Sequence, residues 1–267
     1  GTDMFDAFES FRARVSALRS DADFWSLRHV KSQTLHLGVI KATPLPVHTT
    51  FDEGVMLTAQ VNGFEAYAAT SDLSADGLQR ALVKAEQLAA AAASHALSLP
   101  TASPSRTGQR ADYVSLDLMQ ALPTVAQCLD LLLQECDAVP SDSRIVNREA
   151  RLSWETREQL FFDSTGSQLR FAQRFVYPNM QITAYDGHDS QIRSLSGGNF
   201  AQQGGLDVLA RSGLFGAGAR LADEALQLLL APNTPSGKRH LLLMPDQMIL
   251  QIHESIGHPL EMDRILG

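Results

Sequence analysis

Residues 53–70 read Glu-Gly-Val-Met-Leu-Thr-Ala-Gln-Val-Asn-Gly-Phe-Glu-Ala-Tyr-Ala-Ala-Thr. Apolar and polar side chains alternate over 53–61, which is the period of a strand with one buried face. The Asn62-Gly63 pair that follows indicates a two-residue type I′ turn, because both central positions of that turn need a positive φ. A second strand is expected over 64–70. The stretch therefore predicts a β-hairpin.

Helices and further strands are expected around this hairpin. Residues 3–20 carry apolar side chains at the 3.6-residue period of an amphipathic helix. Two candidate strands, 24–31 and 33–41, lead from this helix to the hairpin. After the hairpin, Ser74 is a plausible N-cap for a second helix over 74–97.

In the second half of the chain, too, segments with the period of a helix alternate with segments that have the pattern of strands. Residues 98–112 show no periodic apolar pattern, which indicates a linker or a surface excursion. A helix is expected over 123–138 and another over 217–230. Between these helices, polar turns separate four short strands, and an antiparallel meander is the simplest connection for such short gaps. These strands are expected at 144–154, 157–163, 167–177 and 180–186.

The changes of period predict an α+β fold. We expect an N-terminal helix-and-sheet domain over 1–100, a linker, and a second, antiparallel sheet-rich domain over 101–235. Residues 236–267 are expected to start a C-terminal domain that carries a metal-binding helix.

Composition restricts the classes of function. The 267 residues include 22 basic and 30 acidic side chains, a net charge of −8, which argues against direct nucleic-acid binding over a broad surface. No apolar run approaches 18 residues and no signal peptide is evident, so we expect a cytoplasmic protein without a membrane span.

Two cysteines, Cys128 and Cys136, lie in one expected helix, about 12 Å apart along its axis and too far for a disulfide. They would be a metal ligand or nucleophile on one reading and small buried apolar residues on the other. We favour the second reading.

The end of the chain carries the chemistry. Residues 240–243 are expected to form a short buried strand, and Pro245 suits the first position of a helix buried by apolar side chains. That helix contains His253-Glu254-x-x-x-His258. Imidazole nitrogen suits zinc, and the neighbouring carboxylate could accept a proton from a metal-activated water.

The two histidines lie five residues apart, which a regular α-helix does not bring to one ion. Five steps of about 100° leave the second ring roughly 140° from the first. A single π-type turn, with i→i+5 hydrogen bonding, would bring the rings together, and such turns cluster at functional sites. Gly257 and Pro259 favour a local irregularity there. A surface or capping pair of histidines is the competing interpretation.

The string His-Glu-Ser-Ile-Gly-His-Pro-Leu-Glu-Met-Asp over 253–263 closely resembles the signature of the TldD/PmbA family. The resemblance is sharp over roughly 251–263 and softer elsewhere. Residues 64–74, which lead into an alanine-rich helix, also resemble the N-terminal domain of TldD-type proteins.

This resemblance implies a TldD-type zinc metallopeptidase, a class formerly described as modulators of DNA gyrase. In such an enzyme His253 and His258 would bind zinc, and Glu254 would act as the general base. The resemblance further implies a third ligand, a cysteine from a C-terminal β-rich domain outside these 267 residues. Substrates would be unfolded or short peptides, held by a homodimer or by a heterodimer with a PmbA-type subunit.

Two rival functions remain open. The chain could be a non-catalytic, PmbA-like partner or scaffold that modulates toxin or topoisomerase systems, although PmbA-type subunits lack the motif at His253. It could also be a metal hydrolase that acts on a non-peptide bond.

Overall fold

The computed structural model of the chain describes residues 6–97, 106–195 and 202–261. Within this part, a nine-stranded sheet has the order β4-β3-β1-β6-β7-β5, with β2 paired to β1 and with β8 and β9 paired to β7. The strands are β1 (Phe24–Ile40), β2 (Thr43–Pro44), β3 (His48–Val61), β4 (Phe64–Thr70), β5 (Arg110–Val114), β6 (Ile145–Asp163), β7 (Gln168–Tyr185), β8 (Ser190–Ser194) and β9 (Gln202–Gln203).

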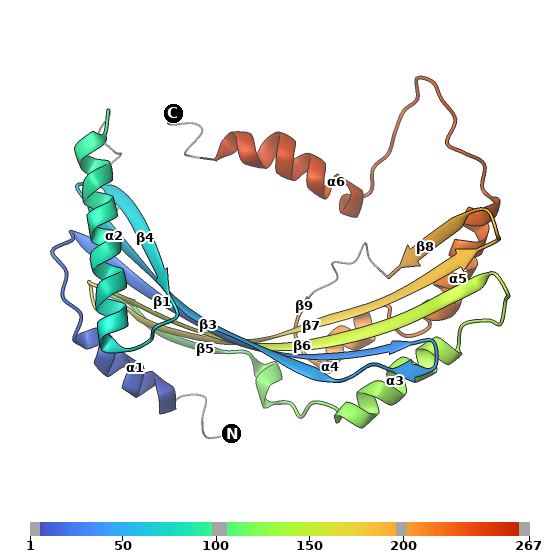
Figure 1. Ribbon diagram of the computed structural model, residues 1–267, viewed down its shortest axis with the longest axis horizontal. Helices are drawn as coiled ribbons and strands as arrows, with labels where there is room; N and C mark the ends of the chain where they lie inside the picture. The colour runs from blue at the N-terminus through green and yellow to red at the C-terminus, as the bar shows by residue number, and fades with distance from the viewer. Residues whose placement is uncertain (1–5, 98–105, 196–201, 262–267) are drawn as a thin grey trace.

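The sheet is curved, and the helices lie around it (Figure 1). α1 and α3 lie on its convex side, α2 stands at one end, and α6 passes across its concave side. The α-helices are α1 (Asp6–Ser16), α2 (Ala75–His95), α3 (Val125–Asp137), α4 (Leu206–Arg211), α5 (Ala217–Leu230) and α6 (Pro245–Ile252). The expected α+β class is confirmed. No helix in the described part of the chain is long and apolar enough to cross a membrane.

The hairpin predicted from Asn62-Gly63 is present between β3 and β4. Asn62 and Gly63 have φ values of 49° and 83°, as a type I′ turn requires. Val61 pairs with Phe64, and the pairing continues to Val55 and Thr70. The following helix begins where expected, because the Ser74 side chain accepts a hydrogen bond from the Gly77 N–H.

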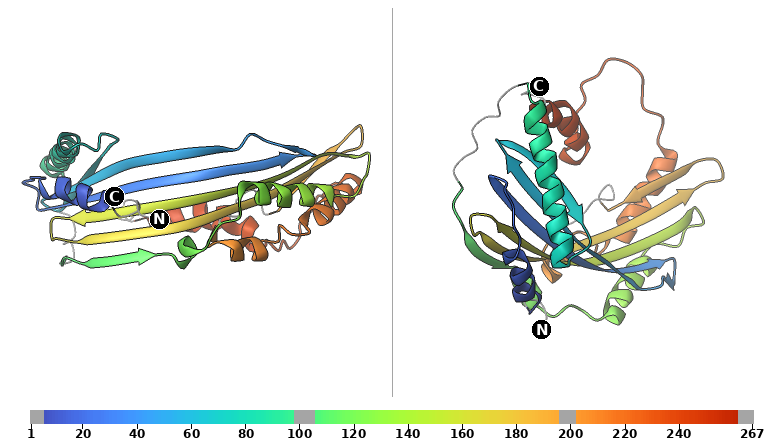
Figure 2. Two further views of the ribbon diagram at one scale, coloured as in Figure 1. Left: turned by 90° about the horizontal axis from the view of Figure 1, so that it is seen from below. Right: turned by 60° about the vertical axis from the view of Figure 1, so that its left-hand side comes forward.

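Three long strands replace the pairs of short strands expected from the sequence. β1 joins the two strands expected at 24–31 and 33–41 into one. The four strands expected between 144 and 186 are likewise two, β6 and β7. Figure 2 shows these strands running along most of the length of the molecule.

The reason for this difference lies in where the helices cover the sheet. Lys31 and Gln33 sit between the two covered ends and are exposed, so the apolar alternation is lost there. The hydrogen-bonded ladder nevertheless continues, because Lys31 pairs with Glu158 and Gln33 with Thr156. A polar interval inside a continuous strand therefore has the same sequence pattern as a turn between two strands.

Pro178 lies inside β7 at a position where a missing N–H costs little. The carbonyl oxygens of Arg174 and Met180 accept hydrogen bonds from the N–H groups of Gly204 and Leu195. The main-chain N–H and C=O groups of the even-numbered residues of β7 therefore point toward β8 and β9. Pro178 has the same parity and falls between the residues that β9 and β8 pair with. Among the described residues none pairs with Pro178 on that side, and proline is tolerated at such strand positions.

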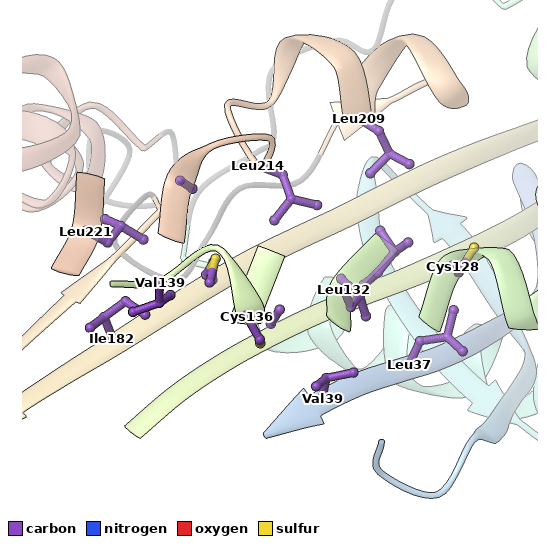
Figure 3. Close-up of a cluster of buried hydrophobic side chains, with 14 of the residues drawn as sticks. Leu37, Val39, Cys128, Leu132, Cys136, Val139, Ile182, Leu209, Leu214 and Leu221 are labelled. Atoms are coloured by element: carbon purple, nitrogen blue, oxygen red, sulfur yellow. The ribbon is translucent and has the colours of Figure 1, made fainter. Parts of the chain in front are cut away.

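The sheet supports two hydrophobic cores. The first packs α1 and α2 on β1, β3 and β4, with Leu57, Leu78 and Leu82 fully buried. The second packs α3, α4 and α5 on β1, β6 and β7 (Figure 3). Phe162 of β6 belongs to the first core, so the sheet is continuous across the domain boundary expected near residue 100. The expected domain limits stay a prediction.

Two expectations about the connecting segments need correction or restriction. The linker expected over 98–112 contains the start of β5, which pairs with β7 in parallel, so the sheet is not a pure antiparallel meander. Residues 98–105 of that linker, and residues 3–5 of the first expected helix, lie outside the described residues.

Replacement of Gly218 by Ala tests the close approach of α3 and α5. A Cβ at this position would lie 2.7 Å from the Glu135 carbonyl oxygen and 2.9 Å from both Met180 and Val139. Because a backbone oxygen cannot move away cheaply, we expect G218A to lower the free energy of unfolding by about 1–3 kcal/mol. Urea denaturation measures this change. Q227A, on the exposed side of α5, is the control, and equal stability of the two variants would contradict the packing described here.

Candidate metal centre

The helix that carries the motif begins as expected, but the residues before it do not form the expected strand. Pro245 occupies the first turn of α6 together with Asp246. Residues 240–243 form no strand and are open to solvent, with Leu242 86% exposed. The expectation of a short buried strand is therefore wrong, because no strand of the described chain lies beside it to complete a ladder.

The apolar stripe of α6 is also exposed. Ile249 and Ile256 are 68% and 55% exposed, and Met248 is half-buried. The sequence predicted that these side chains bury the helix. Within the described residues α6 has no buried residue, so the expectation of a helix buried by its apolar side chains is wrong for this part of the chain.

The backbone from His253 to Gly257 forms a π-helical turn. The His258 N–H donates to the His253 carbonyl oxygen, which is the i→i+5 bond expected from the spacing. The turn places the two imidazole rings 4.3 Å apart between centroids, with their planes at 80°. The π-type turn that the spacing predicted, and that brings His253 and His258 together, is thus present.

Gly257 contributes less to this turn than expected. Its φ of −60° and ψ of −60° are helical values that any residue adopts. A Cβ there would lie 3.6 Å from the Ile252 carbonyl oxygen, an ordinary contact. Pro259 directly follows the π-helical turn, lacks an N–H and lies in a 3₁₀ turn over His258–Leu260. Of the two residues expected to favour an irregular backbone, Pro259 is therefore the one that suits it.

The three polar side chains of the motif converge. Glu254 lies 4.0 Å from His253 Nε2 through Oε1 and 3.9 Å from His258 Nε2 through Oε2. One ligand atom from each residue lies within 4.8 Å of the other two. Two imidazole nitrogens beside a carboxylate are a donor set that suits a divalent metal ion such as zinc.

A fourth residue, Glu261, joins this group. Its Oε1 lies 2.7 Å from His258 Nδ1. The Glu261 N–H donates to the His258 carbonyl oxygen, which closes the 3₁₀ turn. In the sequence, Glu261 is part of the stretch that resembles the family signature, but the sequence alone indicates no contact for it. Its position three residues after a histidine, just past a proline, is the signal that could have found it.

The two cysteines of the described chain lie far from this chemistry. Cys128 and Cys136 are buried in the second core on α3 (Figure 3). Burial raises the pKa of both thiols. They behave as the small buried apolar residues that the sequence favoured.

Three comparisons with known proteins bear on this arrangement. Residues 25–89 match the family PmbA/TldA metallopeptidase domain 1. The resemblance to the TldD/PmbA family is confirmed. A protein named metalloprotease from Methanothermobacter thermautotrophicus is 33% identical over 106 residues, which cover 40% of this chain and 23% of that protein.

Two crystal structures share the fold. A protein from Thermotoga maritima described as a modulator of a DNA gyrase superposes with a TM-score of 0.57 at 14% identity. A protein from Bacteroides thetaiotaomicron with a similar description gives 0.54 at 11% identity. Each match covers 86% of this chain and 50% of the other. The matches therefore span about half the length of these structures and about a quarter of the metalloprotease.

The thiol environment predicts slow alkylation of both cysteines. Because Cys128 and Cys136 are buried and their pKa values are raised, little thiolate is accessible at neutral pH. We expect iodoacetamide to leave both unmodified in the folded full-length protein and to modify both after unfolding in guanidinium chloride. Peptide mapping by mass spectrometry measures the modification at each position. Rapid labelling of either residue before unfolding would contradict the described core.

Proposed function

We propose that this chain is part of a zinc-dependent peptidase of the TldD type, which hydrolyses unfolded or short peptides. The observation that carries the proposal is the π-helical turn that gathers His253, Glu254 and His258. A surface or capping pair of histidines has no need of an i→i+5 turn, whereas a shared ligand site does. The match to PmbA/TldA metallopeptidase domain 1 and the relative named metalloprotease support the same class.

In this proposal His253 and His258 hold the zinc ion through their imidazole nitrogens. Bound zinc would polarise a scissile carbonyl and make a water molecule more acidic. Glu254 accepts a proton from the attacking water and passes it to the leaving amine. Its carboxylate lies within 4.0 Å of a nitrogen of each histidine, close to both ligands.

A zinc site of this kind uses three protein ligands. The third is proposed to be a cysteine from a C-terminal domain beyond these residues, as the family resemblance implies. Cys128 and Cys136 do not suit the role, because both thiols are enclosed in the second core. The match leaves half of the Thermotoga maritima structure and most of the metalloprotease uncovered, which leaves room for such a further domain.

The substitution E254Q tests the catalytic carboxylate. Glutamine keeps the size of the side chain but cannot accept the proton, so we expect zinc to remain bound while kcat falls by roughly 10²–10⁴. H258A should instead lower zinc occupancy and activity together. The measurements are zinc content by atomic emission and cleavage of an unfolded peptide by the full-length protein with its partner present.

These two variants separate the outcomes. Full activity of E254Q would reject the role given to Glu254, whatever its zinc content. Wild-type full-length protein without zinc would reject the metal site and favour the non-catalytic, PmbA-like alternative. E65Q, which alters an exposed carboxylate on β4, is the control and should leave both measurements unchanged.

Enclosure of the site is proposed to need a second subunit. The described site helix is open to water along its apolar side, with Leu250 and Leu260 largely exposed. The family resemblance implies a homodimer or a heterodimer with a PmbA-type subunit. The expected cytoplasmic location stays a prediction.

Association is tested on the full-length protein. We expect multi-angle light scattering at micromolar concentration to report the mass of a dimer, either alone or after addition of the PmbA-type subunit. The apolar side chains of α6 would then lose exposure, which hydrogen exchange across residues 245–260 can follow. Monomer alone under both conditions would contradict the proposed pairing.

A further inference from the structure

Glu261 holds one nitrogen of a ligand histidine. Of the two carboxylates that flank the His258 ring, Glu254 lies 3.9 Å from Nε2, beyond hydrogen-bonding distance, whereas Glu261 lies 2.7 Å from Nδ1. An ionised carboxylate only accepts hydrogen bonds, so the contact requires a proton on Nδ1. In the neutral ring, Nε2 is then the unprotonated nitrogen.

The backbone explains why this carboxylate arrives there. His258 and Glu261 lie three positions apart along a 3₁₀ turn, and side chains at that spacing eclipse in this geometry. The hydrogen bond from the Glu261 N–H to the His258 carbonyl oxygen, 3.2 Å long, fixes the same turn. The π-helical turn thus brings the rings together, and the 3₁₀ turn directly after it supplies the carboxylate.

We propose that Glu261 is a positioning residue that fixes His258 as the Nδ1–H tautomer, so that Nε2 faces Glu254 and is ready to bind a metal ion. This rests on the proposed function and adds the ligand atom and the residue that selects it. Metal-binding histidines commonly donate their other N–H to a carboxylate, which sets the ring orientation and makes the ligand more basic.

The same contact affects Glu254. With its single proton on Nδ1, neutral His258 has no N–H on the side of Glu254. The Glu254 carboxylate is therefore not occupied as an acceptor for that ring and can accept a proton from water. Within the described residues neither ring nitrogen of His253 has a hydrogen bond, so the fixed tautomer is specific to His258.

The test uses the full-length protein with its partner and compares E261Q, E261L and E65L. Glutamine retains an acceptor oxygen, leucine removes it, and E65L removes an exposed carboxylate on β4 as the matched control. Zinc affinity is measured by competition with a chelator. We expect E261L to bind zinc about 10–100-fold more weakly than wild type. E261Q and E65L should stay within about threefold, since neither loses the acceptor.

A second measurement needs no metal. Nitrogen NMR of histidine-labelled, metal-free protein at pH ~8, where an ordinary imidazole is neutral, reports which ring nitrogen carries the proton. We expect His258 to be protonated at Nδ1 in wild type and E261Q and to show a tautomer mixture in E261L. Exposed His253 serves as the internal control and should not respond. The His258 signal is assigned by its loss in H258Q.

The outcomes distinguish the two proposals. Unchanged zinc affinity and an unchanged His258 tautomer in E261L would overturn the role of Glu261 while leaving the peptidase proposal intact. Wild-type protein that binds no zinc would overturn the peptidase proposal, and the tautomer of metal-free His258 would still decide the role of Glu261. Equal weakening by E261Q and E261L, without a tautomer change, would show a general charge effect and would also overturn it.

Discussion

The pairing of β1 with a strand on each side is the constraint on which the rest of the structure depends. β3 pairs with it from Phe24 to His36, and β6 pairs with it from Ser26 to Ile40. This central strand links the helices of the first core to those of the second through one hydrogen-bonded ladder. A shift of one residue between β3 and β1 would turn the apolar side chains of β3 away from the first core. The same shift between β6 and β1 would turn the apolar side chains of β6 away from both cores.

Local chemistry was sufficient to predict some elements and not others. Asn62-Gly63 specifies a type I′ turn by itself, and Ser74 caps its helix through a contact three residues away. The long strands could not be predicted in this way. Their continuity through exposed Lys31 comes from Glu53 and Glu158 on the neighbouring strands, and such partners are not visible in a local window. The alternation of apolar and polar residues in a strand reflects the burial of one of its faces. Between the two cores neither face of β1 is buried, so the alternation is lost there.

At the candidate site, local geometry likewise predicted the π-helical turn correctly but did not predict the surroundings of α6. The π-helical turn follows from the angular spacing of His253 and His258, which depends only on helix geometry. The burial of α6 was inferred from an apolar stripe, which indicates that a partner surface exists but not where it lies. The sequence places Glu261 in the motif but does not show its contact with His258, because that contact depends on a change from π to 3₁₀ geometry within a few residues.

A site built from consecutive turns has a consequence for its chemistry. Backbone hydrogen bonds within one short segment set the relative positions of the side chains from His253 to Glu261. This arrangement therefore forms without a tertiary contact. In open water, however, interactions among these charges are weak, because the high dielectric and mobile ions screen them. Strong polarisation of a substrate requires a site from which water is excluded. The segment therefore supplies the geometry, and under the proposed function a surface that covers its exposed apolar side chains would have to supply the low dielectric. Metal affinity and catalytic rate would then depend on different contacts. The first would depend on the turns around His258, and the second on the proposed cover over Ile249 and Leu250.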